Sequence, residues 1–224
     1  MNINYQVDLC FCIDLSASMN DFLIAWKLTF HGAIKDIRNN LKFKDKNVEV
    51  LRIKIIGFQN GEKKDEVLLE ESAWFILPGN EDELELFLFN LKANGEELSS
   101  SPGLYAIEKA IKQKWTTRGD RQRHIIIVWS DTSTHPLEKN SGSKPSNYPV
   151  GMPKDFNELS DWWDGQEYMT NSSAKRLILF APDNNAWTDI ATHWENTIHH
   201  PSKAGDRLAE LDYKTLIASV TNSI

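Results

Sequence analysis

The sequence predicts an α/β fold in which helices cover both faces of a doubly wound, mostly parallel sheet. Short apolar runs typical of strands alternate along the chain with segments whose apolar residues recur at helical spacing, which indicates βαβ units. The run from Ile125 to Trp129 is continuously apolar, as expected for a central strand covered on both faces. With 224 residues, of which 41% are hydrophobic, the chain is long enough to bury a sizeable core.

The first half of the chain begins with a strand expected at residues 5–13. A helix is expected at 19–41, because one apolar face repeats every three or four positions (Leu23, Trp26, Phe30, Ile34, Ile37 and Leu41). Residues 48–58 alternate and are rich in Val and Ile, which predicts a second strand. The mixed pattern of 66–77 predicts a single edge strand, and a helix is expected at 81–92.

In the second half, the loop 94–102 leads into a helix that carries Leu104, Ile107 and Ile111. A strand follows at 124–129, and a segment rich in Pro, Gly, Ser and Asn at 136–153 precedes a short helix at 154–164. The remaining elements are expected at 176–181 (strand), 187–197 (helix) and 208–221 (helix). We expect one domain over residues 1–224, with 136–165 as an insertion within it.

Charge and hydropathy limit the partners. The net charge of −7 argues against nucleic acid or an anionic membrane as a general partner. No apolar run approaches the roughly 18 residues of a membrane helix. The N-terminus enters the first strand without a basic stretch or a cleavable apolar segment, so we expect a cytoplasmic protein. Cys10 and Cys12 share one face of the first strand and are expected to be buried core residues.

Oxygen-bearing side chains follow two of the predicted central strands. Asp14, Ser16 and Ser18 come directly after the first strand, and Asp131 follows the strand at 124–129. The carboxyl ends of parallel strands lie at one edge of a sheet, which is where open α/β folds bind ligands. Carboxylates and hydroxyls are hard ligands that suit Mg²⁺ or Mn²⁺. The pattern predicts a divalent-cation site.

At this point the chain resembles the von Willebrand factor A domains with their metal-ion-dependent adhesion site. The family pattern is D-x-S-x-S after the first strand, a Thr in a second loop and an Asp after the fourth strand. Residues 14–18 (DLSAS) match the first part, and Trp129-Ser130-Asp131-Thr132 matches the third. Counting back from Ala106-Ile107 puts Ser101 at the Thr position, with Ser99 and Ser100 as alternatives. The segments DTSTHP (131–136) and LILFAPD (177–183) are similar to those of bacterial, intracellular members, including ones in stress-signalling clusters.

The resemblance implies a metal-dependent interaction module. Its metal ligands would be Asp14, Ser16, Ser18, Ser101 and Asp131, its cofactor Mg²⁺ or Mn²⁺, and its partner a protein that supplies an Asp or Glu to the metal. The insertion would rise beside the metal and offer aromatic contacts to the partner (Tyr148, Trp162, Trp163 and Tyr168).

An enzyme is the alternative, because Asp14 and Asp131 with a metal suit phosphoryl transfer or hydrolysis. However, the chain lacks a G-x-x-x-x-G-K-[ST] phosphate loop and a G-x-S-x-G nucleophile elbow, and we expect a protein that is not an enzyme.

Each candidate residue also has an ordinary structural interpretation. Ser18 or Asn20 would serve as the N-cap of the first helix. Ser101 would cap the helix after the second loop, because Pro102 follows it as the first helical residue. Glu96 and Glu97 are backup ligands or a solvated loop. His135 is interpreted as a loop histidine with local bonds. His199 and His200 are adjacent, so on a strand they point to opposite faces and make a poor metal pair.

Overall fold

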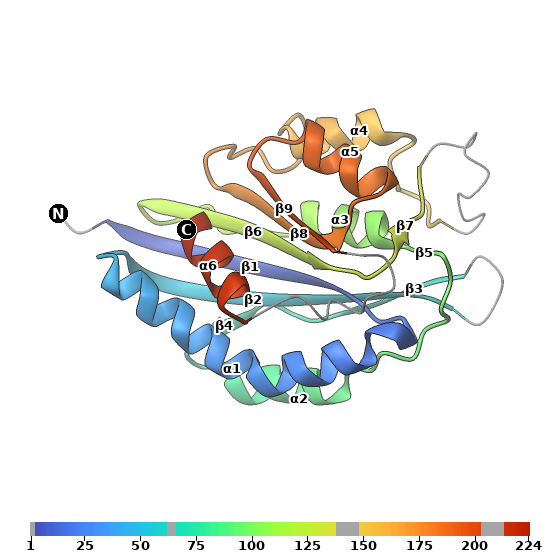
Figure 1. The fold of residues 1–224 in the computed structure, drawn as a ribbon. Helices are drawn as coiled ribbons and strands as arrows, with labels where there is room; N and C mark the ends of the chain where they lie inside the picture. The colour runs from blue at the N-terminus through green and yellow to red at the C-terminus, as the bar shows by residue number, and fades with distance from the viewer. Residues whose placement is uncertain (1–2, 62–65, 138–147, 203–212) are drawn as a thin grey trace.

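A mostly parallel sheet crosses the centre of the molecule (Figure 1). The structure is a computed structural model and describes residues 3–61, 66–137, 148–202 and 213–224. Among these, seven strands form the main sheet, in the order β3-β2-β1-β6-β8-β9, with β4 also paired to β2. The parallel strands are β1 (Asn4–Asp14), β2 (Asn47–Asn60), β6 (Arg121–Trp129), β8 (Lys175–Pro182) and β9 (Thr197–Ser202).

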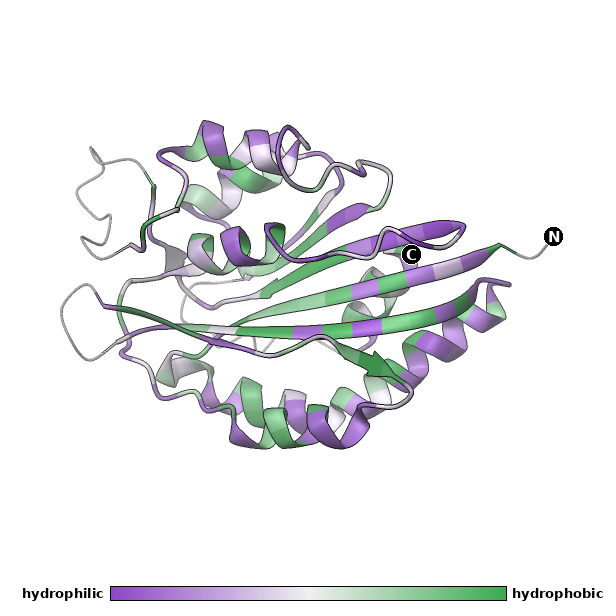
Figure 2. Cartoon of the chain, turned by 180° about the vertical axis from the view of Figure 1, so that it is seen from behind, coloured by the Kyte–Doolittle hydropathy of each residue, from purple (hydrophilic) through white to green (hydrophobic). Residues whose placement is uncertain are grey.

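Helices cover both faces of this sheet, so the predicted fold class is confirmed (Figure 1). The first face carries α1 (Asn20–Phe43), α2 (Glu81–Asn90) and α6 (Tyr213–Ser223). The second carries α3 (Gly103–Ile111), α4 (Phe156–Trp163) and α5 (Asn185–His193). Hydrophobic residues concentrate along the middle of the strands, and hydrophilic ones on the outer helix surfaces and at the strand starts near the N-terminus (Figure 2).

Strand β1 shows how the sequence builds two cores. Its residues alternate between the faces, because successive side chains of a strand point in opposite directions. Leu9, Phe11 and Ile13 belong to the core beneath α1, whereas Cys10 and Cys12 belong to the core beneath α3. Both cysteines are buried and free, as the sequence predicted.

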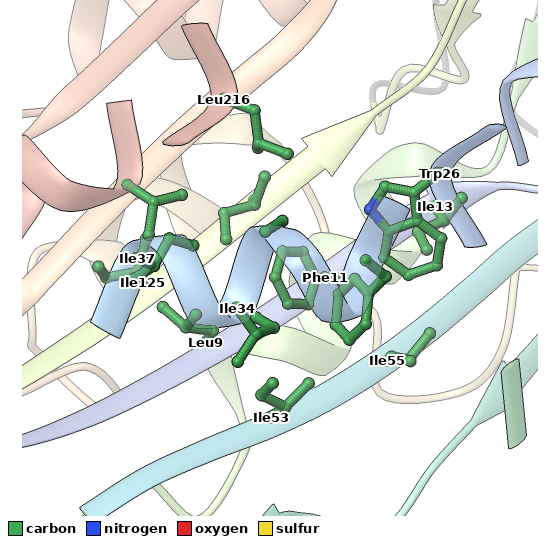
Figure 3. Close-up of a cluster of buried hydrophobic side chains, with 14 of the residues drawn as sticks. Leu9, Phe11, Ile13, Trp26, Ile34, Ile37, Ile53, Ile55, Ile125 and Leu216 are labelled. Carbon is green, nitrogen blue, oxygen red and sulfur yellow. The ribbon is translucent and has the colours of Figure 1, made fainter. Parts of the chain in front are cut away.

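Helix α1 lies along the first face with the apolar stripe that its sequence predicted. All six predicted residues are buried, and Trp26, Ile34 and Ile37 face Phe11 of β1, Ile53 of β2 and Ile125 of β6 (Figure 3). Burying a side chain of this size contributes about 1.5–3 kcal/mol. The stripe therefore fixes the rotation of α1 and the position of its first turn, which lies at the C-terminal edge of the sheet.

Two predicted elements differ from the structure, and one strand was not predicted. The single edge strand expected at 66–77 is two short strands, β3 (Val67–Glu71) and β4 (Phe75–Leu77), both antiparallel to β2. Between them, the Ser72 hydroxyl accepts a hydrogen bond from the backbone N–H of Ile55. This side-chain bond takes the place of a backbone bond and interrupts the regular pairing. The helix expected at 187–197 starts and ends earlier, at Asn185–His193. Strand β9 was missed because its sequence, TIHHPS, is mostly polar and lacks an apolar run.

Among the described residues, no helix is long and apolar enough to cross a membrane. Residues 208–212 of the last predicted helix and 138–147 of the predicted insertion lie outside the described residues.

Candidate metal centre

The ends of β1 and β6 bring two carboxylates to one edge of the sheet. The strands are parallel neighbours in which Ile13 pairs with Trp129, so Asp14 and Asp131 follow from adjacent strand ends. Both residues are fully buried, with 0% of their surface exposed. We call this region, with the loops 14–19, 94–102 and 130–135, the metal edge.

The first loop links the two strand ends through its hydroxyls. The Asp14 Oδ1 atom accepts a hydrogen bond from the Ser16 backbone N–H at 3.0 Å, which closes a tight turn. The Ser16 and Ser18 hydroxyls lie 3.1 Å apart, and Ser18 Oγ donates to Asp131 Oδ1 at 3.2 Å. The D-x-S-x-S residues therefore converge with Asp131 as the sequence pattern predicted.

The structure does not favour helix capping as the role of these serines. A short 3₁₀ turn, η1 (Ala17–Met19), precedes α1, and neither Ser16 at its N-cap nor Met19 at the N-cap of α1 makes a side-chain capping bond. The loop is held by the backbone, because Ala17 N–H donates to the Gly95 carbonyl at 3.0 Å and Gly95 N–H donates to the Leu15 carbonyl at 2.9 Å. A Cβ atom at Gly95 would lie 2.7 Å from Cβ of Gln59, so this close approach requires glycine.

The second loop presents Ser101 rather than its neighbours. The short strand β5 (Ser100–Ser101) pairs in parallel with β7 (Ser133–Thr134), which joins the second loop to the third. Ser99 is exposed, and Ser100 Oγ lies 2.8 Å from Nδ1 of His135. Ser101 is 1% exposed, and it does not cap α3, whose N-cap is Pro102. Ser101 is therefore the serine of this loop that remains for the metal edge.

A polar network beneath Ser101 was not found from the sequence. Asn60, at the end of β2, donates from Nδ2 to the Ser100 carbonyl at 2.9 Å, and its Oδ1 lies 3.0 Å from His135 Nε2. The His135 N–H in turn donates to the Ser101 carbonyl at 2.9 Å. His135 is 9% exposed, so the loop histidine expected from the sequence is a buried connector between two loops and β2. Asn60 is distant from Ser100 and His135 in the sequence, so only the tertiary structure brings it into contact with both.

Two further hydroxyls that the sequence analysis did not select contact Asp14. Ser130 Oγ donates to Asp14 Oδ2 at 2.7 Å, and Thr132 Oγ1 donates to the same oxygen at 3.4 Å. Their positions on either side of Asp131, at the tip of a central strand, are the signal that would have found them.

The electrostatics of the edge favour a cation. Burial raises the pKa of Asp14. Hydrogen bonds from Ser130 Oγ and the Ser16 backbone N–H lower this pKa in part, as does the proximity of the Ser101 and Ser16 hydroxyls. Burial also raises the pKa of Asp131, as do the negative charges of Asp14 and Glu97. In the described chain no Lys, Arg or His forms an ion pair with either carboxylate. A divalent ion would relieve this unfavourable burial of negative charge.

Two buried oxygen atoms at the edge lack hydrogen-bond partners among the described residues. Within the part of the chain that the structure describes, neither Ser101 Oγ nor Asp131 Oδ2 has a hydrogen-bond partner. Buried polar atoms are ordinarily paired, so such atoms suggest a missing ligand. No three side chains of His, Cys, Asp or Glu gather as a metal group in the described ranges. The donor set here contains two carboxylates and takes its other oxygens from hydroxyls, which fits Mg²⁺ or Mn²⁺.

Other residues considered from the sequence lie elsewhere or have other roles. Glu96 and Glu97 are exposed. His199 and His200, on β9, contact the Ala181 carbonyl and the Ser219 hydroxyl through Nε2 at 2.9 and 2.8 Å.

The expected aromatic contacts are wrong for two tryptophans. Trp163 is fully buried and Trp162 is 8% exposed, both within the core under α4. Both lie on the apolar face of α4, which packs against the core, so neither side chain is available to a partner. Tyr148 is partly buried and donates from its hydroxyl to the His135 carbonyl at 3.2 Å, so it supports the third loop from behind.

The chain matches no known family model and no curated protein sequence. Among solved structures it resembles the pilus adhesin SpaC from Lactobacillus rhamnosus GG, with a TM-score of 0.55 and 9% identity over 99% of this chain and 31% of the adhesin. An open conformation of that adhesin gives a TM-score of 0.53 at 11% identity, over 99% and 30%.

A third similar structure is proximal thread matrix protein 1 from the mussel byssus, with a TM-score of 0.51 and 11% identity over 99% of this chain and 48% of that protein. The chain thus spans about a third of the adhesin and about half of the matrix protein. Identities this low show a shared fold alone.

Proposed function

We propose that this chain is a metal-dependent protein-interaction module of the von Willebrand factor A type. Asp14, Ser16, Ser18, Ser101 and Asp131 would hold Mg²⁺ or Mn²⁺ at the metal edge. The observation that carries the proposal is the convergence of two fully buried carboxylates, Asp14 and Asp131, with the buried hydroxyl of Ser101. Ser101 Oγ and Asp131 Oδ2 have no hydrogen-bond partner among the described residues.

The residues of the edge explain how a partner would be selected. Two carboxylates balance the +2 charge of the ion without exceeding it, and the remaining ligands are neutral hydroxyls, so the site would not repel an external anion. The ion would supply a coordination position that an Asp or Glu of a protein partner takes. The adhesin and matrix proteins of similar fold are compatible with an interaction role, although their likeness concerns the fold.

A thermal melt of the EDTA-treated protein tests metal binding. We expect Mg²⁺ or Mn²⁺ to raise the melting temperature of the wild type, because a ligand at a hundredfold excess over its Kd stabilises the native state by about 2.7 kcal/mol. Asp14→Asn keeps the shape of the buried side chain and should lose this response. Asp82→Ala removes an exposed carboxylate on α2 and should keep it. An unchanged melting temperature in the wild type, or an equal response in Asp14→Asn, would contradict the proposal.

A carboxylate probe tests the partner chemistry. Glutarate should raise the melting temperature further only when the cation is present and only with Asp14 intact. A phosphate ester hydrolysed with Mn²⁺ by the wild type, and not by Asp14→Asn, would instead support the enzymatic alternative.

A further inference from the structure

Positively charged side chains gather at the end of the molecule opposite the metal edge. The starts of β1, β2 and β6 and the end of α1 lie together there (Figure 1). Four of the cations lie at the end of α1 and in the turn into β2, and three lie at the starts of β6 and β8. We call these residues the cationic pole: Arg38, Lys42, Lys44, Lys46, Arg121, Arg123 and Arg176.

Within the described ranges, no acidic side chain forms an ion pair with a cation of the pole, and Arg123 Nε donates to the Ile224 main-chain oxygen at 2.9 Å. The ion pairs of the described chain use other cations, such as Arg52, Lys54 and Lys175, and none of the pole. Lys46 and Arg123 instead flank the ring of Tyr5 at 5.9 and 5.6 Å. Burial lowers the pKa of Lys46, and the charges of Lys44, Arg123 and Arg121 lower it further. This mutual repulsion would be relieved by a bound anion.

A hollow of about 690 Å³ opens within the pole. Three cations, Arg38, Lys42 and Lys46, line the hollow. The lining also contains Asn39, Asp45 and Asn47, whose side chains are of a kind that hydrogen-bonds to hydroxyl groups. The volume is in the range of small-molecule sites. Guanidinium and ammonium groups bind phosphate oxygens, whereas a carboxylate in the same hollow accepts hydrogen bonds from hydroxyl groups.

We propose that this hollow binds a compact oligophosphate attached to a hydroxyl-bearing carrier, which is the chemistry of a nucleotide. The size of the hollow and the three cations that line it favour a small ligand. The chain as a whole has a net charge of −7, so a long polyanion such as nucleic acid would be repelled beyond the pole.

Calorimetric titration with ATP in the presence of EDTA tests this site. We expect binding by the wild type, with a Kd that rises with salt, and at least a tenfold loss in Arg38→Ala/Lys42→Ala. Both positions are exposed on α1, where alanine is compatible with the helix. The control Lys154→Ala removes one exposed lysine outside the pole and should bind ATP as the wild type does.

Three results would overturn the proposal. They are no heat of binding with ATP, equal affinity in the double variant, and association with vesicles of phosphatidylserine and phosphatidylcholine in place of ATP. The vesicle test is included because Phe43, which lies between two lysines of the pole, is 91% exposed and could insert into an anionic membrane surface.

The proposed ATP site at the pole is independent of the metal edge. Asp14→Asn should lose the response to Mg²⁺ and keep ATP binding, whereas Arg38→Ala/Lys42→Ala should show the reverse. Loss of ATP binding in Asp14→Asn would also overturn the site at the pole, because it would place the phosphate at the metal edge.

Discussion

The hydroxyl of Ser18 donates to Oδ1 of Asp131 across 3.2 Å, and this contact joins two loops that are 113 residues apart in the sequence. It fixes one oxygen of Asp131 while Oδ2 of the same carboxylate has no partner in the described chain. Ser18 therefore orients the carboxylate, and its own oxygen lies at the same edge of the sheet.

Replacing Ser18 should weaken cation binding. Ser18→Ala removes a hydrogen bond of about 1 kcal/mol, so we expect the Kd for Mn²⁺ to rise by about fivefold or more. Ser18→Thr keeps the hydroxyl and should retain most of the affinity. Titration of the EDTA-treated protein with Mn²⁺, followed by the electron paramagnetic resonance of the free ion, measures both variants. An unchanged Kd in Ser18→Ala would remove Ser18 from the site.

The Asn60 network should support the second loop at a distance from the ion. Asn60→Leu breaks the bonds to the Ser100 carbonyl and to His135 at a position that is 6% exposed, so we expect a loss of about 2 kcal/mol in unfolding free energy. We also expect a weaker Mn²⁺ affinity through a displaced Ser101. Asn60→Asp keeps the acceptor for His135 and should recover part of both.

The matched control for this prediction is Asn47→Leu, which removes an exposed amide whose Nδ2 donates to Asn4 at 2.6 Å. It should leave the Mn²⁺ affinity unchanged. If Asn60→Leu unfolds more easily but binds Mn²⁺ as the wild type does, the network has a structural role only.

The buried ion pair of Arg52 and Asp8 should contribute strongly to stability. Arg52 donates from Nε and Nη2 to the two oxygens of Asp8 at 2.7 and 2.6 Å, and Asp8 is 0% exposed. Arg52→Met would leave that carboxylate without its cation, at a cost of about 3 kcal/mol in urea unfolding. The exposed pair of His31 and Glu85 offers a comparison, and Glu85→Gln should cost less than about 1 kcal/mol. Equal losses in the two variants would contradict this prediction.

Stability should fall in mildly acidic solution because of His124. Burial lowers the pKa of this histidine, which is 4% exposed, and the charges of Arg52 and Arg123 add to the effect. The unfolded chain, with an ordinary pKa of about 6.5, therefore takes up a proton that the folded chain does not. The unfolding free energy should be at its full value above that pH and decrease as the pH drops through it.

His124→Gln should reduce this pH dependence between pH 7.5 and 5.5, as measured by urea unfolding at each pH. His200, whose pKa is also lowered by burial, contributes in the same direction and leaves a residual slope. A slope identical to that of the wild type would exclude His124 as a source.

Local patterns explain which parts of the fold were predictable. The stripe of α1 and the apolar strands β1, β6 and β8 were found because their spacing reflects burial directly. Strand β9 and the division between β3 and β4 were missed, because edge strands need no continuous apolar run and their pairing depends on a neighbour distant in sequence.

The sequence by itself determined the sheet, its two helical layers and the strand ends at which Asp14 and Asp131 lie, because periodic burial and parallel connections restrict where such residues can fall. Only the tertiary structure decided that Ser101, rather than Ser99 or Ser100, faces these carboxylates, and that Asn60 and His135 hold its loop. It also collected seven cations from four segments at the opposite pole. Hydrogen bonds and charge clusters between distant segments depend on side-chain directions in the folded chain, which local spacing does not encode.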